Sequence, residues 1–288
     1  MALTVRAPAK VNLHLRVFPA RDDGFHPLRS WFRTIDLHDE LHVRAADTSG
    51  AGNAAVLRCD DPSVPLDESN LVHRAWRMMA EPAGPDVVME LVKRIPTGGG
   101  LGGGSSDAAA ALSAYSKWRQ APGAASPEQL RRAAERLGSD VPFFLHHQLE
   151  GVTDATCTGR GEVVRPFAPG RRHAVLLILP GIRVATPAVY RQYDALPAPP
   201  DDGEPDFAAW SKLPAHDLLP LLRNDLERAA FSLHPELAEL RRDAEAALGR
   251  TVRMTGSGST LFTLFDDPQE AQDDASRVAA MRVRTLVA

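Results

Sequence analysis

The chain has 288 residues, which is enough for one large domain or for two of ordinary size. Hydrophobic residues make up 44% of it and charged residues 24%, so the composition is that of a globular protein with a substantial core. The formal net charge of −4 gives no sign of a nucleic-acid-binding surface, which would need an excess of basic residues.

The cysteines and the apolar runs exclude further classes. Cys59 and Cys157 have no CxxC spacing, which predicts reduced cytosolic thiols and neither a disulfide framework nor a zinc site. The N-terminus lacks a basic region followed by an apolar run, and the longest apolar run, Ala174–Leu179, is far shorter than the ~20 residues of a membrane span. We therefore expect a cytoplasmic protein with no membrane partner. No residue pattern specifies a metal site or an oligomeric state.

The first part of the chain is predicted to be rich in strands. Residues 3–17 alternate and are rich in Val and Leu, with an interruption at Pro8, and Asp22–Gly24 supplies a turn. Further strands are predicted over 31–37, 40–43, 54–59 and 87–93, with a loop over 47–53 and a helix over 70–80.

Helices dominate the remainder. Ser126 is a predicted N-cap, with Pro127 at the first helical position, for a helix that ends near Gly138. The proline-rich segment 196–205 is predicted to be an exposed loop. Helices are predicted over 213–222, 224–233, 235–248 and 270–281, and strands over 174–179, 260–265 and 283–287. Because helices and strands are intermixed without strict βαβ alternation, the predicted fold class is α+β.

The most informative segment runs from Pro96 to Asp107, where six of the seven residues 98–104 are glycine. It lies between a predicted strand and a predicted helix over 108–117, for which Ser105 or Ser106 is the expected N-cap. Glycine loses the most backbone freedom on folding, so such a run indicates that something approaches the backbone closely. Glycine turns direct successive N–H groups at one point, and a helix start adds a positive dipole end, so the segment predicts a phosphate site. The candidate residues are Pro96, Gly98, Gly99, Gly100, Leu101, Gly102, Gly103, Gly104, Ser105 and Ser106.

Other readings of this segment fit less well. A flexible linker is disfavoured because a good strand precedes the glycines and a good helix follows them. No Gly-Lys-Ser/Thr sequence is present, which excludes a P-loop. The glycines also come late in the chain and outside any βαβ unit with a ribose-binding acid, which disfavours a dinucleotide fold.

Three further segments carry candidate chemistry. Lys10 lies in an apolar strand, where a lysine is costly to bury unless a negative partner meets it; an edge-strand lysine is the alternative. Asp140 follows a glycine helix stop and precedes apolar residues, so it is a candidate base or partner of Lys10; a turn or capping aspartate is the alternative. Met254–Thr260 contains a second glycine turn that could close over phosphate.

His146 and His147 are expected on a strand, where adjacent side chains point to opposite faces. This disfavours a metal ion bound by both histidines.

Taken in chain order, these segments resemble the GHMP kinase superfamily of small-molecule kinases. The resemblance is carried by Pro8–Leu13, by Pro96–Ala110, by Leu137–Phe144 and by Met254–Thr260. Within the superfamily, the chain resembles most the members that phosphorylate the 2-hydroxyl group of a cytidine-diphosphate-linked methylerythritol in non-mevalonate isoprenoid biosynthesis. This narrower resemblance is carried by Asp23–His26, Thr186–Pro187 and Asn224–Glu227.

The resemblance implies a fold and a set of roles. It implies a ribosomal-protein-S5-domain-2-like ATP-side domain over 1–160 and a ferredoxin-like domain over 161–288, with the site in the cleft between them. It implies ATP and Mg²⁺ as cofactors and a small-molecule substrate carrying a cytidine diphosphate group. The implied catalytic residues are Lys10 and Asp140; the implied substrate-binding residues are Asn12, Phe25, His26 and Tyr190; and the implied adenine-side contacts are Asn70 and Lys93, beside the phosphate loop Pro96–Ser106.

Two alternatives stay open at this stage. One is another GHMP kinase that acts on homoserine or mevalonate, against which Asp23–His26 argues. The other is a non-catalytic homologue that binds ligand without turnover, against which the presence of both Lys10 and Asp140 argues. The family commonly has tyrosine where this chain has Phe25, which keeps base stacking and removes a hydroxyl contact. Asp107 places a negative charge at the predicted helix start.

Overall fold

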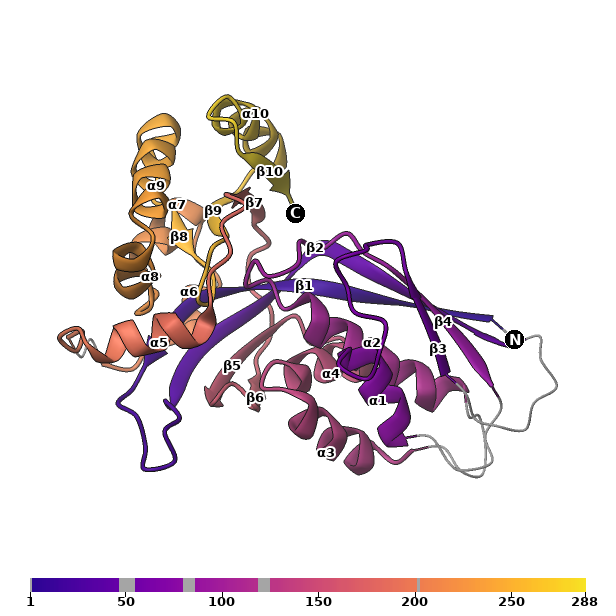
Figure 1. Ribbon diagram of the computed structural model, residues 1–288. Helices are drawn as coiled ribbons and strands as arrows, with labels where there is room; N and C mark the ends of the chain where they lie inside the picture. Colours follow the sequence, from indigo (N-terminus) through magenta and orange to yellow (C-terminus); the bar gives the residue numbers. More distant parts are fainter. Residues whose placement is uncertain (1, 47–54, 80–85, 119–124, 201–202) are drawn as a thin grey trace.

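A computed structural model describes residues 2–46, 55–79, 86–118, 125–200 and 203–288 (Figure 1). The predicted loop over 47–53 lies outside the described residues. The described chain forms two units, each with its own sheet and helices, as expected for an α+β fold. Within the described ranges, no helix combines the length and the apolar character that crossing a bilayer requires.

The first unit is built on a six-stranded sheet. The sheet has the order β3-β4-β2-β5-β6, with β1 paired to β2. Its strands are β1 (Ala2–Val17), β2 (Leu28–Ala45), β3 (Ala55–Cys59), β4 (Val87–Val92), β5 (Asp154–Gly159) and β6 (Val163–Pro166). The prediction of separate strands over 31–37 and 40–43 is wrong, because β2 is one 18-residue strand. His38 and Asp39, which separate the two predicted strands, pair with Pro8 and Ala7 of β1. The register shifts between Pro8 and Ala9, so that Asp36 and Leu37 of β2 form a bulge.

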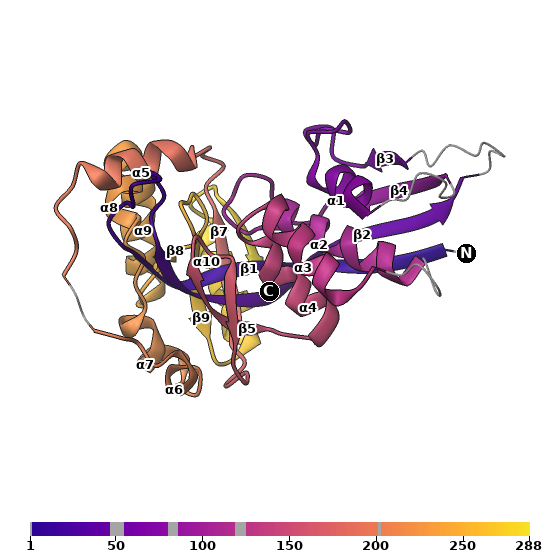
Figure 2. The ribbon, with the colours of Figure 1, turned by 90° about the horizontal axis from the view of Figure 1, so that it is seen from below.

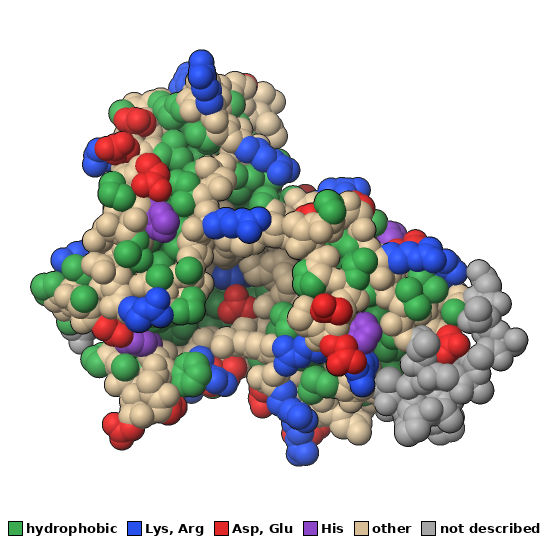
Figure 3. Space-filling view, viewed as in Figure 1, with side chains coloured by type: hydrophobic (Ala, Val, Ile, Leu, Met, Phe, Trp, Pro, Cys, Tyr) green, Lys and Arg blue, Asp and Glu red, His purple; other side chains and the backbone are tan. Residues whose placement is uncertain are grey.

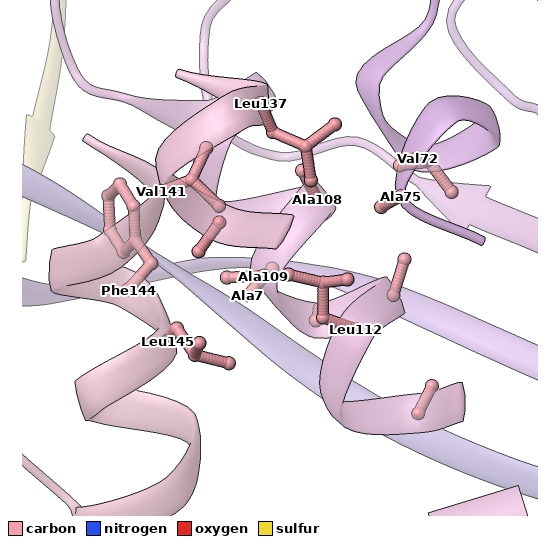
Figure 4. Packing of buried hydrophobic residues seen from close by; sticks show 14 of the residues in the cluster. Ala7, Val72, Ala75, Ala108, Ala109, Leu112, Leu137, Val141, Phe144 and Leu145 are labelled. Carbon is pink, nitrogen blue, oxygen red and sulfur yellow. The ribbon is translucent and has the colours of Figure 1, made fainter. Parts of the chain in front are cut away.

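Four helices lie together against this sheet: α1 (Leu71–Met79), α2 (Gly103–Trp118), α3 (Pro127–Leu137) and α4 (Val141–Glu150) (Figures 1 and 2). Helix α2 is central because a run of alanines allows its neighbours to approach closely. Figure 4 shows Ala108, Ala109 and Leu112 of α2 among side chains of β1, α1 and α4, and all three are fully buried. The glycine loop therefore leads into a helix that is fixed on several sides.

The second unit has a four-stranded antiparallel sheet of order β10-β7-β9-β8. Its strands are β7 (Ala174–Leu179), β8 (Arg253–Met254), β9 (Leu261–Phe265) and β10 (Arg284–Val287). Its helices are α5 (Thr186–Asp194), α6 (Phe207–Trp210), α7 (Ala215–Leu218), the 3₁₀ helix η1 (Leu219–Leu221), α8 (Glu227–Leu233), α9 (Pro235–Leu248) and α10 (Pro268–Ala279).

The β1–β2 hairpin joins the two units, and Figure 1 shows both strands running from one into the other. Leu15 and Val17 at the end of β1 belong to the core of the second unit. The backbone of Leu15 forms hydrogen bonds with Arg223 (2.8 Å) and Asp225 (3.0 Å). Since β6 continues the first sheet to Pro166, we propose that the boundary between two domains lies after residue 166 and not at residue 160.

Several predicted elements match the structure and others do not. The strand over 174–179 and the helix over 235–248 have the predicted bounds, and Ser126 caps α3 in a capping box with Gln129. The helix predicted over 213–222 is wrong as one element, because proline interrupts it and it divides into α7 and η1. The expected strand around His146 and His147 is also wrong, since both residues lie on α4. Sequence analysis did not identify α4, α5, α6, β5 or β6.

Candidate active site

A cavity of about 700 Å³ lies between the two units. That volume is in the range of small-molecule sites. Figure 3 shows a hollow on this face of the molecule, between the lobe at upper left and the lobe at right, with basic and acidic side chains inside it. Both units contribute to the wall. The cavity is lined by Lys10, Asn12, Leu15, Gly24, Phe25, His26, Leu28, Phe32, Gly100, Gly102, Ser139, Asp140, Arg160, Thr186, Pro187, Tyr190, Arg191, Asp194, Leu226, Gly256 and Ser257.

Lys10 of β1 lies at the floor of the cavity and is only 3% exposed. Its Nζ donates to Asn12 Oδ1 at 2.5 Å and to the carbonyl oxygen of Gly100 at 3.2 Å. The ammonium also lies 4.7 Å from the centre of the Phe32 ring and 3.4 Å from Asp140 Oδ2. These contacts compensate the cost of burying the charge. Among the described strands β1 pairs only with β2, so Lys10 does lie on an edge strand, but its side chain is buried in the cavity floor and does not face solvent.

Asp140 stands at the N-cap position of α4, yet its side chain makes no capping hydrogen bond. The alternative of a helix-capping aspartate is therefore wrong. The carboxylate faces the cavity, with its side chain 28% exposed, and pairs with Lys10. The short stretch between α3 and α4 holds it there, since α3 ends at Leu137 and α4 begins at Val141. The two predicted catalytic residues come from distant parts of the sequence and meet at one point.

The glycine loop closes one side of the cavity. Gly98, Gly100 and Gly102 have φ values of +74°, +77° and +74°, which an L-residue with a side chain rarely adopts. A Cβ on Gly102 would lie 2.9 Å from the Phe144 ring and 3.3 Å from Lys10 Cε. The loop therefore needs glycine for its backbone conformation and for the space above Lys10.

Helix α2 begins earlier than predicted, at Gly103. The prediction of Ser105 or Ser106 as N-cap is wrong, because both lie in the first turn and Ser106 N donates to Gly102 O at 2.9 Å. Ser106 Oγ is buried without a hydrogen-bond partner among the described residues, whereas Ser105 is partly exposed and Gly104 is exposed. The open end of the helix thus presents Gly104 and Ser105 to solvent.

The second glycine turn, Thr255–Ser259, packs directly on the first. A Cβ on Gly100 would lie 2.8 Å from Thr255 O and 3.2 Å from Gly258 O. Asn224 holds the turn by donating from Nδ2 to Met254 O (2.8 Å) and Gly256 O (2.7 Å). Thr255 Oγ1 in turn accepts from Asn12 N at 2.9 Å. The second unit thereby fixes both the phosphate-loop candidate and the strand that carries Lys10.

The other end of the cavity is aromatic and polar. Tyr190 of α5 and His26 lie with ring centres 5.3 Å apart, and burial raises the pKa of Tyr190 to about 12, so it stays a neutral phenol. His26 Nδ1 donates to Phe18 O at 2.9 Å, and Nε2 lies 3.2 Å from Asp194 Oδ1. Phe25 is half exposed at the rim of the same cavity. The structure thus brings Phe25, His26 and Tyr190 to one end of the cavity that also holds Lys10.

Asn70 and Lys93 do not line the cavity. Asn70 is buried, donates to Pro65 O at 2.7 Å and accepts from Val72 N at 2.8 Å, which caps the start of α1. Lys93 Nζ forms ion pairs with Asp39 and, at 2.7 Å, with Asp107. Their predicted adenine-side contacts stay a proposal, and the polar groups of both residues are engaged within the protein.

Sequence reasoning missed some residues at this site. Arg160, in the turn between β5 and β6, lies 4.9 Å from the centre of the Phe25 ring. Asp194 at the end of α5 meets His26. No local pattern identifies them, because each acts through a partner distant in sequence.

The comparisons with known proteins agree with this geometry. The family model "GHMP kinases N terminal domain" matches residues 70–148, and "GHMP kinases C terminal" matches residues 212–283. A 4-diphosphocytidyl-2-C-methyl-D-erythritol kinase from Rhodococcus jostii is 41% identical, with 96% of this chain and 87% of the relative covered. One from a Nocardioides species is 39% identical, with coverages of 94% and 91%.

Solved structures give the same result. A crystal structure of 4-(cytidine 5′-diphospho)-2C-methyl-D-erythritol kinase has a TM-score of 0.79 and 36% identity, covering 99% of this chain and 98% of that one. Homoserine kinase from Cytophaga hutchinsonii has a TM-score of 0.65 at 18% identity, covering 100% of this chain and 93% of that one, which shows a shared fold alone.

We predict that Gly102→Ala lowers both stability and ATP binding. The positive φ and the contacts with Phe144 and Lys10 should cost about 2 kcal/mol or more, and the loop must shift to relieve them. Gly104→Ala is the matched control, because a Cβ there has open space. Thermal unfolding should show a lower Tm for the first variant only. An unchanged Tm and an unchanged KM for ATP in Gly102→Ala would contradict the geometry.

We also predict a pH-dependent effect of Asp107→Asn. Burial, with Asp39 nearby, raises the pKa of Asp107 to about 7, although Lys93 opposes the shift. Between its ordinary pKa of 3.8 and about 7, the folded chain binds a proton that the unfolded chain has lost, so this group's contribution to stability falls as the pH rises. Asp107→Asn should therefore gain stability relative to wild type between pH 5 and pH 8.

Urea denaturation at both pH values measures this difference. Asp243→Asn, exposed on α9, is the control and should keep the same difference from wild type throughout. If the difference in unfolding free energy between Asp107→Asn and wild type does not change with pH, Asp107 is ionised throughout this range in the folded protein.

Proposed function

The chain belongs to the GHMP kinases and, within them, to the 4-diphosphocytidyl-2-C-methyl-D-erythritol kinases, and from this we propose that its cavity transfers the γ-phosphoryl group of ATP to the 2-hydroxyl group of that substrate. The reaction is a step of non-mevalonate isoprenoid precursor biosynthesis. The observation that carries the proposal is the pair Lys10–Asp140, at 3.4 Å, between a glycine loop on one side and a base-sized aromatic pocket on the other.

We assign the ATP phosphates to the loop Pro96–Ser106. Gly104 is exposed, Ser105 is partly exposed, and both lie in the first turn of the 16-residue helix α2. Free N–H groups and the positive end of the helix dipole stabilise negative charge there. The hydroxyl of Ser105 adds a donor that can follow the phosphate.

Mg²⁺ would be held mainly by the phosphates. No group of three or more His, Cys, Asp or Glu side chains suited to a metal is present among the described residues. Mg²⁺ commonly binds through one or two protein oxygens together with substrate phosphates and water, which this donor set allows. Asp140, which lines the cavity, and the partly exposed Ser105 at the start of α2 are the protein residues that we propose for this role. When bound, the ion offsets charge on the phosphates.

Asp140 and Lys10 have different roles at the substrate hydroxyl group that accepts the phosphoryl group. The Asp140 carboxylate accepts the hydrogen bond of the substrate hydroxyl and takes its proton as the new P–O bond forms. Lys10 lies close enough to both the carboxylate and the loop to stabilise the charge that develops between them. Asn12 fixes the ammonium through its Oδ1, so the donor does not need to reorganise during the reaction.

The aromatic end orients the substrate. We propose that Phe25 and Tyr190 stack on the two faces of the cytosine and that His26 reads its edge. Binding of the base at this end positions the 2-hydroxyl group of the substrate near Asp140. Because the reacting groups are then already oriented, the reaction is faster. The residue at position 25 is a phenylalanine, which stacks as a tyrosine would and contributes no hydroxyl contact.

A substrate panel separates this proposal from its alternatives. ADP release, followed by a coupled assay, is expected with 4-diphosphocytidyl-2-C-methyl-D-erythritol and not with homoserine or mevalonate. If homoserine or mevalonate is turned over with a kcat/KM comparable to that of the cytidylyl substrate, the chain is instead a GHMP kinase for one of those substrates. Binding of the cytidylyl substrate without ADP release would favour the non-catalytic one.

We predict that Asp140→Asn lowers kcat by about 10²–10⁴-fold, because the amide cannot take the proton. The side chain makes no cap hydrogen bond, and Lys10 keeps Asn12 Oδ1 and Gly100 O as acceptors, so the fold should persist, although Lys10 loses its counter-charge. ATP affinity, measured by calorimetry, should stay within about threefold, since loop and helix start are intact. Asp243→Asn on α9 is the control. A kcat near that of wild type would remove Asp140 from the catalytic role.

We predict that Phe25→Ala raises KM for the cytidylyl substrate by about tenfold or more, since loss of base stacking costs ~1–3 kcal/mol. The side chain is half exposed, so stability should change little. KM for ATP should be unaffected, and Phe25→Tyr, which retains the ring, should behave as wild type. If Phe25→Ala has an unchanged KM for the cytidylyl substrate, the ring only packs at the rim.

A further inference from the structure

A second cavity, of about 690 Å³, is as large as the active-site cavity and lies on the opposite side of strand β2. Phe32 lines the first cavity and its neighbour Arg33 lines the second, and adjacent residues of a strand point to opposite faces. The second cavity is formed by β1, β2, the end of α4 and residues 169–175. None of the roles assigned above involves it.

The charges around this cavity are mainly positive. Four arginines line it, Arg6, Arg33, Arg171 and Arg172, together with the two aspartates Asp36 and Asp154. Arg171 is already paired, because its Nε donates to Asp266 Oδ1 at 2.7 Å. Asp154 is already engaged, because it accepts from Arg33 Nε at 2.7 Å and from Trp31 Nε1 at 2.8 Å. In a chain of net charge −4, this is a local concentration of positive charge.

Arg33 is buried, at 7% exposure, and is held in one orientation. Its Nε donates to Asp154 and its Nη1 to His173 Nδ1 at 3.0 Å. His173 Nε2 donates to Leu213 O at 3.0 Å, so Nδ1 is the acceptor, and burial with Arg33 nearby lowers the pKa of this imidazole and keeps it neutral. Arg33 Nη2 has no hydrogen-bond partner among the described residues. A fixed guanidinium with one unused edge is suited to an anion.

Arg6 and Arg172 are the other two cationic side chains that we consider for binding an anion in this cavity. Both are exposed, and within the described ranges neither side chain has an ion-pair partner. Pro8, Ile35 and Val175 supply an apolar part of the wall. The volume greatly exceeds the space that a single phosphate needs and suits a drug-sized molecule.

We propose that this cavity is a second ligand site, specific for a small organic molecule that carries a phosphate or diphosphate group next to an apolar part. The anionic group pairs with Arg33, Arg6 and Arg172, and the apolar part contacts Pro8, Ile35 and Val175. The site is separate from the reaction, since β2 stands between it and Lys10.

Calorimetric titration of the full chain with phenyl phosphate tests the proposal. The active-site cavity is first saturated with CDP and a non-hydrolysable ATP analogue, so that binding there does not contribute. We expect saturable binding with a Kd of roughly 1 mM or below. The double variant Arg6→Ala/Arg172→Ala should bind about tenfold more weakly. Both residues are exposed, so the variant should fold, and its kinase activity should equal that of wild type.

Arg132→Ala on α3 is the matched control, because it removes an exposed arginine far from the cavity, and it should bind as wild type does. Inorganic phosphate should bind more weakly than phenyl phosphate, because it lacks the apolar part. The proposal is overturned if no binding is seen once the active site is occupied. It is also overturned if the double variant and the control bind phenyl phosphate equally well.

Discussion

The buried ammonium of Lys10 is the constraint on which the arrangement of the site depends. A lysine that is 3% exposed needs hydrogen-bond acceptors and a counter-charge, because burying an unpaired charge is costly. Here the acceptors are Asn12 Oδ1 and Gly100 O, and the counter-charge is Asp140. One cation therefore holds β1, the glycine loop and the start of α4 at the same point, and the proposed phosphoryl transfer uses all three.

The glycine loop owes its shape to the second unit as much as to its own sequence. Gly100 lies so close to Thr255 O and Gly258 O that no side chain fits between the two turns. The second turn is fixed by Asn224 and by Glu227, which accepts from Met254 N at 2.8 Å. Residues about 120 or more positions away in the sequence thus fix the loop that we propose binds phosphate.

Much of the site could be predicted from the sequence because its motifs are local. The glycine run between strand and helix, Lys10 within an apolar strand and Asp140 after a helix stop each carry a signal that needs no tertiary information. What could not be predicted depends on distant partners. The resemblance implies nucleotide contacts for Asn70 and Lys93, and the sequence does not reveal that Asn70 caps α1 or that Lys93 pairs with Asp39 and Asp107.

The same limit applies to the fold. The two polar residues His38 and Asp39 lie between the predicted strands 31–37 and 40–43, and only their pairing with Pro8 and Ala7 shows that β2 continues through them. Helix α4 was missed because its sequence, Val141–Glu150, is apolar at first and lacks a periodic stripe. Strand β6 is short, and its pairing with β5 decides that it is a strand at all.

The charge balance at the loop explains why the reaction would need a divalent cation. The lysine nearest to the loop in sequence, Lys93, is occupied by two buried carboxylates and cannot neutralise phosphate. Lys10 reaches the loop only at Gly100 and is shared with Asp140. Backbone N–H groups and the dipole of α2 supply partial charges, which are insufficient for the several negative charges of a triphosphate. In the proposed reaction the remaining positive charge would come with the nucleotide, and Mg²⁺ would supply it, with Ser105 and Asp140 as the protein oxygens proposed above.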